Sequence, residues 1–161
     1  MNYRKVVAAT HRLELLRRIK SREAMATVGL YPGQLPLLEY IQDHPGCTQK
    51  EAADELDITP ASAAASLKRL EKAGLVARKA GARDARCNYL YITSAGVERV
   101  QAGRRLFDAL DEQMFSGLTE EEIQAFHGVC EKMFDNLADE SCRHLTVWML
   151  ARRAHEEKEG K

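Results

Sequence analysis

The sequence is poor in aromatic residues and carries no excess of charge of either sign. Only 6% of its 161 residues are aromatic, and 24 Lys and Arg residues balance 24 Asp and Glu residues. No stretch approaches the roughly 20 apolar residues that span a bilayer, and the basic, amphipathic N-terminal residues lack the apolar run of a signal peptide. These absences predict a cytoplasmic protein with a mainly aliphatic core and no membrane partner.

Motifs for enzymatic or metal chemistry are also missing. The four cysteines form no C-x-x-C pair, which in a reducing cytosol predicts free thiols. Three short His–Cys pairs each offer two ligands, whereas a zinc site needs at least three that converge; they are His44 with Cys47, His127 with Cys130, and Cys142 with His144. No Gly-rich phosphate loop or nucleophile–base pair is found. We therefore expect no enzyme activity, no metal and no cofactor.

The distribution of charge is more informative than its sum. Acidic residues outnumber basic ones between residues 94 and 140, whereas basic residues predominate between residues 59 and 93. The bases of that middle segment are Lys68, Arg69, Lys72, Arg78, Lys79, Arg83 and Arg86. A basic middle beside an acidic C-terminal part predicts one face for a polyanion such as DNA and another that is kept away from it.

Apolar periodicity and capping residues predict a mainly helical chain. Thr48 and Thr119 each begin a capping box with the glutamate three residues later, Thr59-Pro60 fits a helix start, and Ser94 is the expected cap of a further helix. The predicted helices cover about residues 3–26, 34–43, 49–57, 60–73, 94–115 and 120–137. An amphipathic stretch over about 141–157 either forms a separate helix or continues the last one.

The segment from residue 48 to residue 93 has the most specific pattern. Only Ile58 and the capping Thr59 separate its two short helices, and so tight a link forces the sharp crossing of a helix-turn-helix. After Gly74 the apolar period changes from helical to alternating, which predicts strands over 75–79 and 89–93 joined by a polar tip. The predicted fold is mainly α with a small β-hairpin wing. It is a single domain, residues 1–161, with a winged helix-turn-helix (about 34–93) between helices over about 3–26 and 94–138.

These residues resemble the MarR family of bacterial transcription regulators. Asp84, Arg86, Ile92 and Thr93 fit the family's wing motif, Asp-x-Arg followed after five residues by Leu or Ile and Thr, and residues 59–76 resemble its recognition helix and the exit from it. The resemblance covers about residues 5–138. It implies an effector-released repressor that acts as a homodimer held by its N- and C-terminal helices, with recognition helices in successive major grooves of a pseudo-palindromic operator.

The candidate DNA-binding residues lie on the two short helices and at the wing tip. Basic side chains on the recognition helix suit phosphates or a guanine edge, wing arginines suit the minor groove, and small residues allow contact with thymine methyl groups. The predicted set is Gln49, Lys50, Thr59, Ala61, Ser62, Ala65, Lys68, Arg69, Arg83 and Arg86. Asp84 is expected to orient one of the wing arginines, or Arg78, through an ion pair.

Release from DNA has two candidate triggers. In the family, effectors often bind in a crevice between the dimerisation helices and the DNA-binding lobe, and helical spacing gives His11, Leu15, Tyr40 and Phe107 as candidate lining residues for a small molecule. The alternative trigger is oxidation of Cys87 in the wing tip.

The alternative function is a winged helix that binds protein instead of DNA. The basic recognition helix and the arginine-bearing wing disfavour it.

Overall fold

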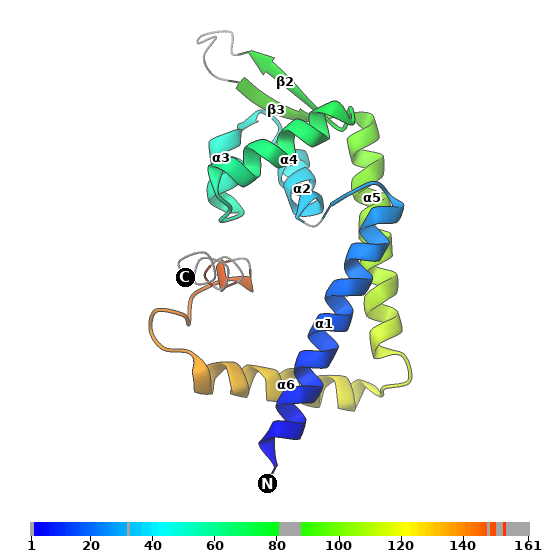
Figure 1. Cartoon of the computed structure of the whole chain (residues 1–161), viewed down its shortest axis with the longest axis vertical. Helices are drawn as coiled ribbons and strands as arrows, with labels where there is room; N and C mark the ends of the chain where they lie inside the picture. The colour runs from blue at the N-terminus through cyan, green and yellow to red at the C-terminus, as the bar shows by residue number, and fades with distance from the viewer. Residues whose placement is uncertain (1, 32, 81–87, 148, 151–152, 154–161) are drawn as a thin grey trace.

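The computed structural model describes residues 2–31, 33–80, 88–147, 149–150 and 153, and consists of a lobe and a long arm (Figure 1). The arm pairs α1 (Tyr3–Thr27) with α5 (Ser94–Phe115), and α6 (Glu120–Leu137) crosses its far end. The lobe holds α2 (Gln34–Asp43), α3 (Gln49–Glu55) and α4 (Pro60–Lys72). Because α5 packs against both α1 and α2, it connects the arm with the lobe.

A small antiparallel sheet completes the lobe. Its strands are β1 (Cys47–Thr48), β2 (Val76–Ala80) and β3 (Asn88–Ile92), in the order β1-β3-β2. The hairpin of β2 and β3 confirms the predicted wing strands to within one residue. The two-residue strand β1 was not predicted, because so short a segment has no apolar alternation to detect.

The hydrophobic core lies in the lobe and is mainly aliphatic, as predicted. Its largest fully buried side chains come from α2, α4 and β3, and are Leu37, Leu38, Ile41, Leu67, Leu70 and Leu90. Met25 of α1 and Val100 of α5 join the same cluster. Large apolar side chains of the arm, by contrast, are exposed: Val7, Leu16 and Ile19 on α1, and Phe126, Val129 and Met133 on α6.

Local capping chemistry builds the helix-turn-helix as the sequence predicted. The Thr48 hydroxyl accepts from the backbone N–H of Glu51 at 3.2 Å, while the Glu51 carboxylate accepts from the backbone N–H of Thr48 at 2.7 Å. The second helix, α4, begins with Thr59 at the cap and Pro60 in its first turn. Between the helices Asp57 adopts a φ of 48°, a left-handed conformation that aspartate tolerates in turns.

Two expectations about helix ends are wrong. The cap of α5 is Thr93 and not Ser94, because the Thr93 hydroxyl accepts from the N–H of Gly96 at 3.0 Å and donates to the Gly74 carbonyl at 2.7 Å. Residues 140–144 form a turn and not the start of a helix over 141–157. The Asp139 carboxylate accepts from the backbone N–H groups of residues 141 and 142, which stabilises this turn, and described helical residues begin at Val147.

Gly96 fixes the junction between α5 and the sheet. A Cβ atom there would lie 2.3 Å from the Leu75 carbonyl oxygen and 2.6 Å from Ile92 Cγ1, so the backbone itself would have to move. We expect Gly96→Ala to lower the free energy of unfolding by about 1–3 kcal/mol, measured by urea denaturation.

Gly103→Ala is the matched control on the same helix. Its Cβ would meet the Leu35 side chain, at 3.0 Å from Cδ1, and no backbone atom, so a shift of a few tenths of an ångström in that side chain would be enough. Alanine also favours the helix. Equal urea midpoints for the two variants would contradict the close packing at Gly96.

Candidate nucleic-acid interface

One exposed row of side chains runs along α4 on the face opposite the core. The buried positions of this helix are Ala63, Leu67 and Leu70. The spacing of 3.6 residues per turn places a second set on the opposite face, and all of its members are exposed: Ala61, Ala65, Lys68 and Lys72. We call these four residues the outer row. Lys72 was not among the predicted DNA-binding residues, although its spacing from Ala61, Ala65 and Lys68 was visible in the sequence.

The N-terminal end of α4 presents two hydroxyl groups to solvent. Thr59 accepts from the backbone N–H of Ser62 at 3.1 Å and donates to the Ser62 hydroxyl at 2.9 Å. Both residues are exposed. A helix N-terminus favours anions, because its first N–H groups have no partner within the helix and its dipole is positive at that end.

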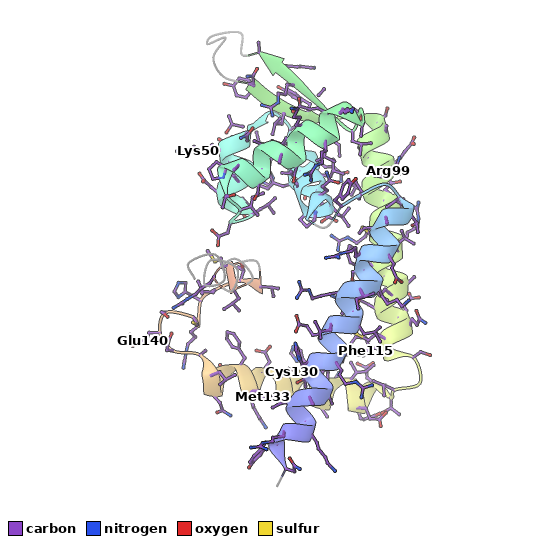
Figure 2. The ribbon with its side chains drawn as sticks, in the orientation of Figure 1. Lys50, Arg99, Phe115, Cys130, Met133 and Glu140 are labelled. Carbon is purple, nitrogen blue, oxygen red and sulfur yellow. The ribbon has the colours of Figure 1, made fainter. Side chains whose placement is uncertain are left out.

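Gln49 and Arg78 connect three elements of the lobe. The Gln49 side chain accepts from Arg78 Nη2 at 3.3 Å and donates to the Pro60 carbonyl at 3.5 Å. Arg78 Nε in turn donates to the Glu71 carboxylate of α4 at 2.5 Å. The ion-pair partner of Arg78 within the described residues is therefore Glu71, so Arg78 and Gln49 tie α3 and α4 to the wing strand β2. Lys50, next to Gln49, is exposed (Figure 2).

Two cations of the lobe lie over aromatic rings. Arg69, beside the outer row on α4, has its guanidinium carbon 5.4 Å from the ring centroid of Tyr31, in the α1–α2 linker. Lys79 of β2 lies 4.7 Å from the ring centroid of Tyr91 on β3. Neither contact was predicted. Arg69 and Tyr31 have no periodic relation in the sequence, and the Lys79–Tyr91 contact, between diagonal neighbours on the two wing strands, depends on the register of the hairpin.

The predicted wing-tip residues Arg83, Asp84, Arg86 and Cys87 lie outside the described residues. Their roles in minor-groove binding, arginine orientation and thiol oxidation therefore stay predictions. Strands β2 and β3 pair in register from Val76↔Ile92 to Ala80↔Asn88 and carry the ends of the tip.

Buried and hydrogen-bonded titratable groups support the local framework. The pKa of Glu51 is lowered because the backbone N–H and hydroxyl of Thr48 both donate to its carboxylate. Burial raises the pKa of the Cys47 thiol and that of the Tyr40 hydroxyl. Within the described part of the chain, no group of three His, Cys, Asp or Glu side chains is placed to hold a metal ion, and no helix is long and apolar enough to cross a membrane.

The predicted effector residues differ in how exposed they are. His11 and Leu15 are exposed on α1, whereas Tyr40 and Phe107 are half-buried against the core. A hollow of about 380 Å³ beside α1 includes His11. A second hollow, of about 480 Å³, lies between α2 and α5 and is lined by other residues, Glu39, Gln42, Asp43, Arg104 and Arg105 among them. We call it the α2–α5 hollow.

Comparison with known proteins finds a match to the MarR family over residues 28–86. The transcriptional regulator BilQ of Clostridium symbiosum is 30% identical over 105 residues, which cover 65% of this chain and 73% of that protein. The transcriptional repressor MdtR of Bacillus subtilis is 34% identical over 109 residues, covering 65% of this chain and 68% of that protein.

Solved structures share the same fold. YusO of Bacillus subtilis superposes with a TM-score of 0.74 at 24% identity, covering 84% of this chain and 96% of that chain. A mutant of MepR from Staphylococcus aureus, bound to an oligodeoxyribonucleotide, gives a TM-score of 0.64 at 24% identity. The match covers 83% of this chain and 98% of that chain. The mainly helical winged-helix architecture is therefore confirmed.

Proposed function

Since this chain belongs to the MarR family of winged-helix transcription regulators, we propose that it binds an operator as a homodimer, with α4 of each chain in the major groove. The outer row of α4 carries this proposal. It presents two small side chains and two lysines on a helix whose opposite face is fixed in the core. The major groove of B-DNA admits one α-helix, and an exposed row of this kind faces the bases when the helix lies in it.

The chemistry of the outer row divides the contacts into two kinds. Ala61 and Ala65 let the helix approach the base edges and contact thymine methyl groups, but they offer no side-chain hydrogen bonds. Lys68 and Lys72, further along the same row, have side chains long enough to reach and neutralise backbone phosphates. At the N-terminal end, the Ser62 hydroxyl accepts from Thr59 and can still donate its own proton to a phosphate. Specificity then depends on methyl contacts and DNA shape more than on bidentate hydrogen bonds.

The exposed faces of the arm support a homodimer. The apolar stripe of α6 comprises Ile123, which is partly exposed, and the exposed Phe126, Cys130, Met133 and Leu137. A contiguous exposed apolar stripe marks an interaction site. Charge on the two helices is complementary. α1 is rich in Arg and Lys, whereas the bases of α6 are outnumbered by its acids, Glu120, Glu121, Glu122, Glu131 and Asp135. A second copy of the chain supplies both the matching apolar face and the opposite charge.

We also propose that a small molecule releases the DNA by entering the α2–α5 hollow. The Arg104–Glu39 ion pair bridges α5 and α2 beside this hollow, so an occupant would change how the lobe sits on the arm. Successive major grooves are about 34 Å apart, and a few ångströms of splay would misplace one recognition helix. A preference of about 1.4 kcal/mol for the misfit state lowers the affinity tenfold. Oxidation of Cys87 is the rival trigger.

Selection from a random-sequence duplex library tests the proposed function. The expected result is enrichment of an inverted repeat whose half-sites are about one helical turn apart, bound by two chains. A protein-binding winged helix would enrich no sequence and show no affinity for duplex DNA at physiological salt.

A further inference from the structure

The α1–α2 linker holds one aromatic residue in a fixed place on the surface. The N–H of Tyr31 donates to the Gln34 side chain at 2.8 Å, and the N–H of Gln34 donates to the Tyr31 carbonyl at 3.1 Å. Gln34 is only 2% exposed and Leu30, the residue before Tyr31, only 3%. The backbone of Tyr31 is therefore anchored in the core, while 60% of the residue remains exposed.

The start of the linker is fixed by the arm. The Arg99 guanidinium of α5 donates to the carbonyl of Val28, the residue that follows α1 (Figure 2 labels Arg99). Gly29, the next residue, has a φ of 67°, so the chain turns sharply there in a conformation that glycine adopts without strain. The backbone at Tyr31 is thus held from both sides, by α5 at the start of the linker and by α2 at its end.

Arg69 of the recognition helix lies across this ring, 5.4 Å from its centroid. Within the described part of the chain no carboxylate lies at ion-pair distance from Arg69, so its charge is available to a ligand. A guanidinium that stacks on an aromatic ring uses its planar face, and its N–H groups around the edge remain free to donate. The contact with Tyr31 and a hydrogen bond to a phosphate can therefore form together.

We propose that Tyr31 is a positioning residue for DNA binding, whose ring holds the Arg69 guanidinium beside the outer row so that its edge meets a backbone phosphate. This inference rests on the proposed function. A free arginine samples many rotamers and loses that freedom when it binds, whereas an arginine already stacked on a fixed ring loses less. Arg69 therefore binds the sugar-phosphate backbone as a prepositioned group, unlike the unstacked Lys68 and Lys72.

Four variants in a double-mutant cycle test this role: Tyr31→Leu, Tyr31→Phe, Arg69→Gln and the Tyr31→Leu/Arg69→Gln pair. The probes are a duplex recovered by selection and a mixed-sequence duplex, because a phosphate contact acts on both. Loss of a cation–π contact at an exposed site corresponds to about a two- to fivefold change in affinity. We expect Tyr31→Leu to weaken binding by that factor on both duplexes, Tyr31→Phe to bind like the parent, and Tyr31→Leu to have no further effect once Arg69 is glutamine.

A merely structural role for Tyr31 would give different results. If Tyr31→Leu lowers the affinity for DNA by the same factor in the parent and in the Arg69→Gln variant, the proposal is overturned. A lower affinity in Tyr31→Phe, which keeps the ring, also overturns it. Unchanged binding by Tyr31→Leu overturns it as well. Melting temperatures of all four variants should match that of the parent. If the parent binds neither duplex, the proposed function itself fails, which is a separate outcome from a parent that binds and is insensitive to Tyr31.

Discussion

The Met133→Asp variant is expected to sediment as a monomer and to bind a selected operator at least about a hundredfold more weakly than the parent. Met133 is 42% exposed and lies in the apolar stripe of α6, which we propose to be covered by a second chain. An aspartate there would place a charge without a partner in the covered interface, and that cost is large. A monomer binds one half-site only. In the dimer, binding of the first recognition helix holds the second at high effective concentration near the other half-site, and the monomer loses this advantage.

Gln124→Asp is the matched control, since it introduces the same charge on the face of α6 away from the stripe. Gln124 is exposed and donates to Glu120 at 3.1 Å. This variant should remain a dimer and bind DNA like the parent. A Met133→Asp protein that is still dimeric at micromolar concentration would contradict the proposed interface, as would a monomer that binds the full operator undiminished.

The Lys68→Ala/Lys72→Ala variant should lose about a hundredfold in affinity at physiological salt. Each lysine of the outer row is exposed and is proposed to contact a backbone phosphate. A hydrogen bond to a charged group contributes about 1.5–3 kcal/mol, or roughly tenfold per lysine at the lower end. The slope of log affinity against log salt should fall in magnitude by about 0.9 for every phosphate contact removed. The melting temperature should not change, because neither side chain joins the core.

Lys132→Ala is the control for this pair, since Lys132 is an exposed lysine on α6 and outside the proposed interface with DNA. Its affinity and salt dependence should equal those of the parent. Unchanged binding by the Lys68→Ala/Lys72→Ala variant would mean that the outer row does not face the DNA.

Features that depend on neighbouring residues were predictable from the sequence. The caps at Thr48, Thr59 and Thr119 connect atoms three residues apart, and all three are observed. Ser94 was the wrong cap because Ser and Thr in adjacent positions are equally good caps locally. The choice of Thr93 is made by its contact with Gly74, which lies 19 residues earlier in the chain.

Contacts between distant segments were not predictable in the same way. No periodicity relates Arg78 to Glu71 and Gln49, or Arg69 to Tyr31, since these contacts arise from how α3, α4, the wing and the linker pack. The effector residues His11, Leu15, Tyr40 and Phe107 stay a prediction. Tyr40 and Phe107 are half-buried against the core, and the lining of the α2–α5 hollow could not be read from helical spacing because it depends on how α2 and α5 pack.

The most direct test of DNA recognition by a dimer is sedimentation of the parent chain with a labelled duplex recovered by selection, repeated at increasing salt. We predict a complex of two chains per duplex, whose affinity falls steeply as salt rises because α4 neutralises phosphates. Affinity for a scrambled duplex should be lower by at least about a thousandfold. A complex of one chain per duplex, or equal affinity for the selected and scrambled duplexes, would contradict recognition of an operator by a homodimer.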